Sequence, residues 1–349
     1  METTKPKLTW KTIVLPIIGL AAFFLYIYLY GVDIPTIIAT AQNANPLLYS
    51  AAILISLLEV FFHAVSWRAL LNSLQVKLSV VKANLFVWYG IFMDIVIPAE
   101  SVSGEVCRIY LVTREQGDTS GKTVASLVLQ RLLGMGINVA VLIIGIALLV
   151  LGELQIDQLI FNLIVFVTAA IAAILLLIIA FSFKENLSIK AINALIRVGD
   201  FIIRGKWNLF NKFKEEAYNT TKMFHDSMQE YRRKPRAVAV GLFWLVLNWA
   251  CSFAVPYLVF LALDFPVSLS VILITSAIVV AVKSIPVGVP FEVGLPEIAM
   301  TTLFVAMLGT EYSILCATVT ILSRLITLWL RFGIGFAAQQ WIELKPIVT

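Results

Sequence analysis

Long apolar segments recur along this chain, and a helix of roughly 20 apolar residues is long enough to cross a lipid bilayer. Of its 349 residues, 60% are hydrophobic and 13% are charged, whereas soluble domains are about 25% charged. Because a helix in lipid satisfies its backbone polar groups internally, the sequence predicts an all-α, multi-pass protein of the cell membrane. Six uninterrupted segments are expected to span the bilayer: residues 12–30, 46–67, 123–151, 159–183, 237–263 and 313–339.

Two further apolar segments lead into the same acidic pattern, Pro-x-Glu-x-x-x-x-Glu. The first copy begins at the end of residues 81–98, and the second begins shortly after residues 269–286. Each copy is expected to lie in a re-entrant hairpin of two short half-helices, because proline interrupts helical hydrogen bonding and glycine permits sharp bends. The predicted hairpin breaks are Pro98, Gly104, Pro286, Pro290 and Gly294.

The distribution of Lys and Arg sets the predicted orientation, since cytoplasmic loops are enriched in these residues. With two re-entrant hairpins, no Lys or Arg falls in an external loop, and both termini are cytoplasmic. The basic connector, residues 184–236, then lies on the cytoplasmic side, either as an amphipathic segment along the leaflet or as a solvated helical hairpin. The alternative topology has eight or nine ordinary crossings and places Arg114 outside.

The two acidic patterns belong to a longer internal repeat. They are offset by 192 residues, and VKLSV and QRLL in the first half have counterparts VSLSV and SRLI in the second. The repeats cover about residues 46–151 and 237–340 of a single integral membrane domain, residues 1–349. Because the hairpins enter from opposite faces, the predicted fold is an inverted repeat of six spanning helices and two re-entrant hairpins, a recurrent plan among transporters.

Several charged residues lie in or beside the apolar segments, where an isolated charge costs about 2.5–3.5 kcal/mol. The simplest pairing sets a glutamate of each acidic pattern against an arginine of the following helix, Arg131 in the first repeat and Arg324 in the second. Such pairs either brace the fold or bind and gate an anionic headgroup, which guanidinium groups recognise through paired hydrogen bonds. The predicted binding or gating residues are Glu100, Glu105, Arg108, Arg131, Glu292, Glu297, Arg324 and Arg331.

The chain lacks the patterns typical of metal, cofactor or nucleic-acid sites. Its three cysteines and two histidines show no paired or metal-ligand spacing, and no Gly-rich phosphate loop or nucleophile elbow is present. The net charge of +5 is explained by basic cytoplasmic loops and needs no nucleic acid. No catalytic residue, metal or cofactor is predicted, and the chain is not expected to be an enzyme.

Three stretches resemble the transmembrane region of lysylphosphatidylglycerol synthases and its stand-alone relatives. They are IPAESVSGEVCRIYLVTREQG, ASLVLQRLLG and PVGVPFEVGLPEIAM, and the resemblance runs from about residue 46 to residue 340. The sequence departs from the family at Phe291 and Glu292, where glycines are frequent, which implies a stiffer hairpin or a different substrate. The matching positions are Pro98, Gly104, Glu105, Arg108, Arg131, Pro290, Gly294 and Glu297.

The resemblance implies a flippase-like protein. In two-domain relatives, the membrane part is similar to a flippase for the charged lipid that an aminoacyltransferase domain makes. Here the chain ends ten residues after the last predicted helix, so we expect no such domain and no lysine transfer. Similar membrane regions also accompany polyisoprenyl-phosphate glycosyltransferases.

The leading hypothesis is therefore a flippase that moves an anionic phospholipid or a polyisoprenyl-phosphate-linked lipid by alternating access. Its expected partners are these membrane lipids and a glycosyltransferase or lipid-modifying enzyme. Two alternatives remain: an ion-coupled transporter of a small polar solute, and a non-transporting membrane subunit of a glycosyltransferase system.

Overall fold

The computed structural model describes residues 34–97, 102–117, 119–152, 157–183, 207–283 and 294–344, and every regular element in these ranges is helical. The helices of the first part are α2 (Ile34–Gln42), α3 (Pro46–Ser73), α4 (Val80–Val96), α5 (Val102–Gln116), α6 (Ser120–Leu151) and α7 (Gln158–Phe183). Those of the second part are α9 (Trp207–Arg233), α10 (Pro235–Ala262), α11 (Leu269–Lys283), α12 (Leu295–Leu308), η2 (Thr310–Tyr312), α13 (Ser313–Arg324), η3 (Leu325–Leu330) and α14 (Arg331–Leu344).

Five helical stretches in the described residues are long and apolar enough to cross a membrane. They are Pro46–Ser73, Ser120–Leu151, Gln158–Ala180, Pro235–Ala262 and Thr310–Leu344. Helices of sufficient length and apolar composition are thus present at five of the six expected spans, and the remaining one, residues 12–30, lies outside the described residues. The four helices beside the acidic patterns, α4, α5, α11 and α12, have only 17, 15, 15 and 14 residues. Whether they cross or re-enter stays a prediction.

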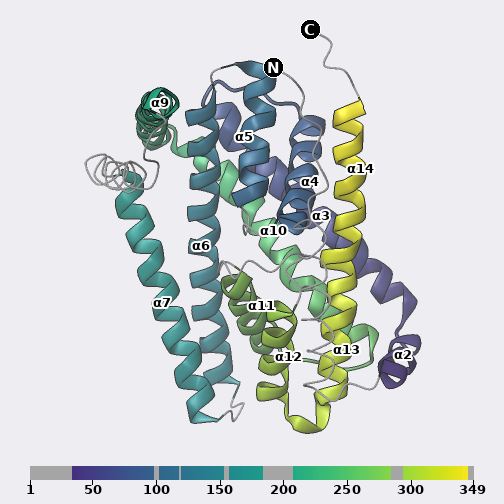
Figure 1. The fold of residues 1–349 in the computed structure, drawn as a ribbon. Coiled ribbons are helices and arrows are strands. Elements are labelled where there is room, and N and C mark those ends of the chain that lie inside the picture. Colours follow the sequence, from purple (N-terminus) through teal and green to yellow (C-terminus); the bar gives the residue numbers. More distant parts are fainter. Residues whose placement is uncertain are drawn as a thin grey trace.

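Helices α3 and α10 form the most extensive helix–helix contact, and α10 crosses the middle of the molecule in Figure 1. Each begins with proline, which suits the first helical position because no hydrogen bond is lost there. Two residues beyond the end of each helix the backbone has positive φ, 67° at Gln75 and 56° at Asp264. The helices approach closely at Gly241, whose carbonyl accepts a hydrogen bond of 2.8 Å from Ser66 Oγ.

The short helices form two pairs at opposite ends of the molecule. Figure 1 shows α4 and α5 in the upper half and α11 and α12 in the lower half. Helix α4 packs against α14, and α11 packs against α6. Both contacts are close at a glycine, since an added Cβ on Gly335 would lie 2.7 Å from the Trp88 carbonyl oxygen, and one on Gly145 would lie 2.8 Å from Ile274 Cγ1. Each short pair therefore packs against a membrane-length helical stretch of the other half, Ser120–Leu151 or Thr310–Leu344.

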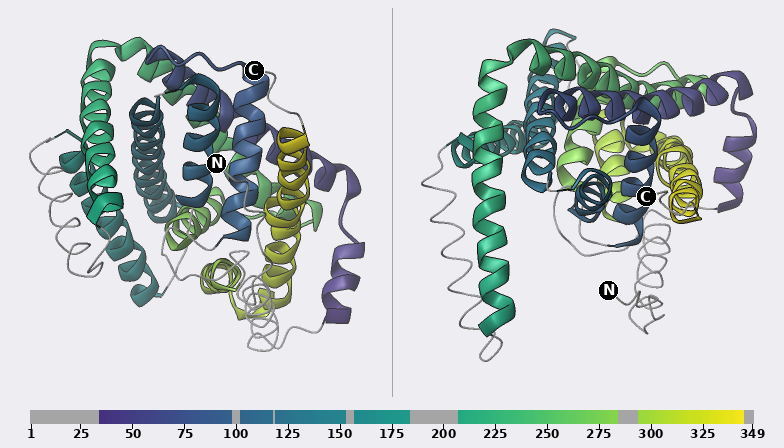
Figure 2. Two further views of the ribbon diagram at one scale, coloured as in Figure 1. Left: turned by 45° about the horizontal axis from the view of Figure 1, so that its top comes forward. Right: turned by 90° about the horizontal axis from the view of Figure 1, so that it is seen from above.

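Helix α9 lies across one end of the bundle. It is seen end-on in Figure 1 and lengthwise in the right view of Figure 2. Its C-terminal part buries Met228 and Tyr231 against α6 and the end of α3, and the Tyr231 hydroxyl donates a hydrogen bond of 3.0 Å to the Leu70 carbonyl. This helix belongs to the predicted basic connector, of which residues 184–206 lie outside the described residues.

A π-helical segment of six residues, η3, joins α13 to α14. Arg324 immediately precedes it and Arg331 immediately follows it. π-Helical turns are rare in proteins, but those that do occur are often found at functional sites. Two of the predicted binding residues are therefore positioned by an irregularity in the helix that carries them.

Candidate functional site

A buried ion pair joins the start of α12 to the end of α13. Gly294 precedes α12 with a φ of 104°, which favours glycine, and Glu297 lies in the first turn that follows. Glu297 Oε2 accepts a hydrogen bond of 2.7 Å from the Gly294 N–H, and Oε1 accepts one from Arg324 Nε. The Glu297 and Arg324 side chains are only 2% and 8% exposed. The helix start and the guanidinium together satisfy this buried carboxylate.

A related ion pair joins the start of α5 to α6, but it is more exposed. Glu105 lies in the first turn of α5, and its Oε1 is 3.5 Å from Arg131 Nη1. The Glu105 and Arg131 side chains are 22% and 40% exposed. Ion pairs in contact with solvent contribute only about 0–1 kcal/mol. Glu105 and Arg131 can therefore separate at low cost.

Both pairings expected from the sequence are thus present, with Glu105 and Glu297 as the acidic partners. The glutamate precedes its arginine by 26 residues in the first pair and by 27 in the second. The two pairs share their place at a helix start and differ in exposure. That these residues bind or gate a substrate stays a prediction.

Gly104 lies inside the first turn of α5, contrary to its expected place at a hairpin break. Helices α4 and α5 approach so closely that an added Cβ on Gly104 would lie 2.5 Å from the Gly90 carbonyl oxygen. Asp94 on α4 accepts hydrogen bonds from the Ser103 hydroxyl at 2.8 Å and from the Gly104 N–H at 2.7 Å. Glycine is needed here for helix contact and not for a bend.

Arg108 is buried on α5 and lies over an aromatic ring of α3. Its guanidinium is 5.4 Å from the centroid of the Trp67 ring, and its Nε donates a long hydrogen bond of 3.4 Å to the Gly104 carbonyl. Trp67 is itself fixed by a 3.0 Å hydrogen bond from its Nε1 to Ser126 Oγ. Among the described residues, the buried Arg108 Nη1 has no hydrogen-bond partner.

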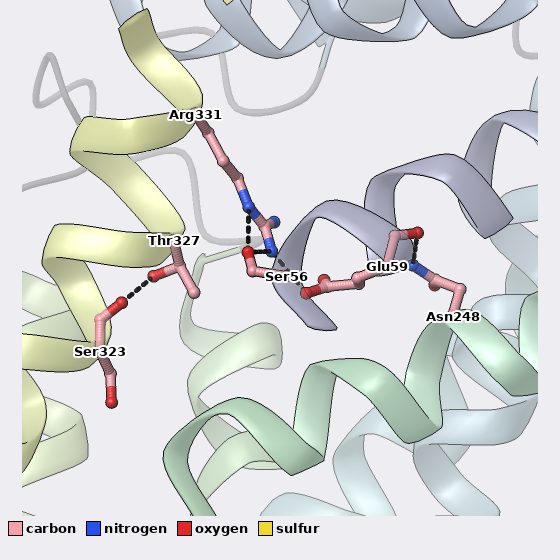
Figure 3. A network of polar contacts seen from close by, with 6 residues as sticks. All are labelled: Ser56, Glu59, Asn248, Ser323, Thr327 and Arg331. Carbon is pink, nitrogen blue, oxygen red and sulfur yellow. Dashed lines mark hydrogen bonds and ion pairs between the residues drawn. The ribbon is translucent and has the colours of Figure 1, made fainter. Parts of the chain in front are cut away.

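Arg331 forms a third polar cluster, with residues of α3 and α10 (Figure 3). Its Nε and Nη2 donate to Ser56 Oγ at 3.2 Å and 2.8 Å, and Nη2 also pairs with the Glu59 carboxylate. Asn248 donates a 2.9 Å hydrogen bond to the Glu59 backbone carbonyl. The sequence predicts no partner for Arg331, because Glu59 lies 272 residues away and no local pattern connects the two.

The remaining predicted positions lie outside the described residues. They are Pro98, Glu100, Pro286, Pro290 and Glu292. Within the described ranges, no three His, Cys, Asp or Glu side chains are grouped to hold a metal ion. Chemically, the described site consists of guanidinium groups with carboxylate partners of different exposure, an arrangement that suits binding of an oxyanion such as phosphate.

Known proteins resemble this chain over nearly its full length. The family described as the lysylphosphatidylglycerol synthase TM region matches residues 13–335. A UPF0104 membrane protein of Pyrococcus horikoshii is 25% identical over 328 residues, which cover 93% of this chain and 95% of the relative. A UPF0104 membrane protein of Methanocaldococcus jannaschii is 25% identical over 343 residues, which cover 97% of each protein. This chain therefore belongs to the family of the lysylphosphatidylglycerol synthase transmembrane region.

Proposed function

We propose that this protein is a transporter that moves a lipid with an anionic headgroup across the membrane by alternating access. The lipid is an anionic phospholipid or a polyisoprenyl-phosphate-linked lipid. The observation that carries the proposal is the pair of Arg–Glu contacts at helix starts, one buried and the other long and exposed. When two inverted halves alternate, one gate is closed while the other is open.

The packing supports an internal repeat beyond the sequence matches. Helices α3 and α10 occupy the same place in the two halves, and the contacts of α4 with α14 and of α11 with α6 correspond when the halves are exchanged. Likewise, α5 packs against α6 as α12 packs against α13. The pair α4 and α5, in the upper half of Figure 1, then corresponds to the pair α11 and α12 in the lower half. An inverted repeat requires such a placement at opposite ends.

The basic residues of the chain support the proposed orientation of the protein in the membrane. The basic connector that contains α9 belongs in the cytoplasm by the positive-inside rule, and α4 and α5 lie at the same end of the molecule as α9 in Figure 1. The exposed Glu105–Arg131 pair then belongs to the cytoplasmic half, and the buried Glu297–Arg324 pair belongs to the external half. We assign this conformation to a state open toward the cytoplasm.

A phosphate-bearing headgroup competes with Glu105 for Arg131. Guanidinium groups bind phosphate through paired, charge-assisted hydrogen bonds, and the start of α5 adds a favourable helix dipole. Glu105 holds Arg131 while no lipid is bound and releases it when the phosphate arrives. Since an exposed pair contributes only about 0–1 kcal/mol, this exchange costs little. Glu297 and Arg324 perform the same exchange when the external half opens.

The experiment measures movement of a fluorescent anionic phospholipid across vesicles that contain the purified protein. In Arg131→Gln, we expect the initial rate to fall roughly tenfold or more, because a charge-assisted hydrogen bond to the phosphate is lost. In Glu105→Gln, we also expect a lower rate, because no carboxylate then competes with the phosphate for Arg131 and helps to release it. Glu115→Gln is the matched control, because Glu115 lies on the same helix in an exposed ion pair with Lys82. This control is expected to keep the wild-type rate.

Other outcomes reject the proposal. A wild-type rate in both variants would show that the Glu105–Arg131 pair only braces the fold. If the wild-type protein moves neither an anionic phospholipid nor a polyprenyl phosphate but takes up a small polar solute, the protein is a solute transporter. If it moves none of these, a supporting role beside a glycosyltransferase becomes the better explanation.

A further inference from the structure

Two arginines of the candidate site occur in only one half of the repeat. The offset of 192 residues between the acidic patterns places Met300 at the position of Arg108, and the offset of 193 between the arginine helices places Asn138 at the position of Arg331. The ion pairs described above are duplicated, but these two cations are not. Any property that depends on them therefore exists once per chain.

The fold brings both single-copy arginines to one face of α3. Arg331 contacts this face at one end, through Ser56 and Glu59, and Arg108 lies over the other end, at Trp67. His63 lies between these two contacts along the helix. Four side chains spaced by three or four residues lie on this side of the helix: Ser56, Glu59, His63 and Trp67.

Arg108 differs from Arg131, Arg324 and Arg331 because it forms no ion pair with a carboxylate of the described residues. The carboxylates near Arg108 are engaged elsewhere, Glu105 by Arg131 and Asp94 by the start of α5. In the part of the chain that the structure describes, no carboxylate oxygen lies within 4.0 Å of the Arg108 guanidinium, and Nη1 is buried without a hydrogen-bond partner. A buried cation without a partner is unfavourable. An anionic ligand with oxygen acceptors would remove this cost.

We propose that Arg108 is a fixed binding residue for one phosphate group per chain. Glu105 lies one helical turn before Arg108 and is directed at Arg131. A phosphate that displaces Glu105 from Arg131 gains Arg108 as a second, permanent donor. Because the second half has Met300 instead, the phosphate is held in the half that contains α5. The identity of the natural ligand, a lipid phosphate, rests on the proposed function. Binding of phosphate to the site can be measured without any transport.

The chemistry favours phosphate over a carboxylate. Two guanidinium groups, those of Arg108 and Arg131, present more donors than the two oxygens of a carboxylate can accept at once. A phosphate monoester offers three terminal oxygens, which match paired donors from both arginines. A lipid phosphate and free inorganic phosphate share this group, and the experiment separates them.

The test uses the purified full-length chain in a neutral detergent and three variants. Arg108→Met introduces the residue that the second half carries, and Arg108→Lys keeps the charge without the planar donor fork. Arg114→Met removes an exposed arginine from the same helix and serves as the matched control. The probes are a short-chain phosphatidic acid, inorganic phosphate, and a diacylglycerol with the same chains. The rise of the thermal unfolding midpoint with probe concentration gives an apparent affinity.

We expect phosphatidic acid to stabilise the wild type and Arg114→Met equally and diacylglycerol to stabilise neither. The apparent affinity should fall roughly tenfold or more in Arg108→Met, and Arg108→Lys should lie in between. Stabilisation by phosphatidic acid alone assigns the site to a lipid headgroup. Stabilisation by inorganic phosphate as well assigns it to the phosphate group itself.

Stability without a probe separates binding from bracing. Since Arg108→Met removes a buried charge that forms no ion pair among the described residues, its unfolding midpoint should equal or exceed that of the wild type. A lower midpoint would identify Arg108 as a brace and overturn the proposal, as would wild-type affinity in Arg108→Met or equal stabilisation by diacylglycerol. If phosphate binding persists but the wild type moves no lipid in vesicles, the proposed transport is rejected and the phosphate site stands.

Discussion

At the scale of single residues, burial decides what an Arg–Glu pair contributes. The pair of Glu297 and Arg324 is almost completely buried, so each charge depends on the other, whereas Glu105 and Arg131 are partly exposed. Removing one partner of a buried pair leaves an uncompensated charge. Two pairs with the same chemistry and an equivalent place in the repeat therefore differ in what they do for stability.

Glu297→Gln is expected to destabilise the protein by about 3–5 kcal/mol, because Arg324 keeps its charge in a buried place. Glu105→Gln is the matched control and should change stability by only about 0–1 kcal/mol. Equilibrium unfolding in mixed detergent measures the free energy of unfolding of each variant. Similar effects in the two variants would contradict the difference in burial.

At the scale of helices, the close contact of α4 with α5 positions the charged residues of the first half. Gly104 allows this contact, and the Asp94 carboxylate satisfies its N–H. Glu105 follows in the same turn of α5, and Arg108 follows in the next turn. The distance between α4 and α5 therefore fixes where both side chains lie.

Gly104→Ala is expected to destabilise the protein by about 1–3 kcal/mol, because the added methyl group overlaps the backbone of α4. Gly136→Ala on α6 is the control, since an added Cβ there has no neighbour within 4 Å. It should be neutral or stabilise by up to about 1 kcal/mol, because alanine favours helices. The unfolding midpoints of both variants check this prediction, and an equal response would show that α4 and α5 are not in such close contact.

At the scale of the whole molecule, the two halves of the sequence repeat pack closely against each other. Each short helix pair packs against a membrane-length stretch from the other half: α4 packs against α14, the last part of Thr310–Leu344, and α11 packs against α6. A relative rotation of the halves therefore moves both short pairs at once. The proposed alternating access requires such coupling, and it also requires that the two predicted hairpins enter from opposite faces.

Single cysteines test this topology by labelling with a membrane-impermeant reagent. A cysteine in place of Glu311 is expected to react from outside, and cysteines in place of Arg114 or Arg233 only from inside; all three native side chains are exposed. External labelling at Arg114 would reject the re-entrant hairpin and favour ordinary crossings. The background should first lose the free native cysteines, Cys107, Cys251 and Cys316.

The sequence by itself determined where the long helices lie and which residues pair with Arg131 and Arg324. Apolar segments of bilayer length predict spanning helices because lipid offers no partners for an unpaired backbone, and all five predicted spans in the described residues are present. The partners of Arg131 and Arg324 were predictable since a charge in an apolar helix needs a nearby opposite charge. The repeat narrowed the choice to two glutamates in each half.

Only the tertiary structure decided how these residues differ. The exposure of Glu105 and burial of Glu297 depend on how helices distant in sequence cover them, and the contact of Arg331 with Glu59 joins residues 272 positions apart. The π-helical segment before Arg331 shifts that side chain from the position a regular helix would give it. Among the described residues, Arg108 forms no ion pair for the same physical reason: packing between helices, which no local pattern encodes, places carboxylates in contact with some cations and not with others.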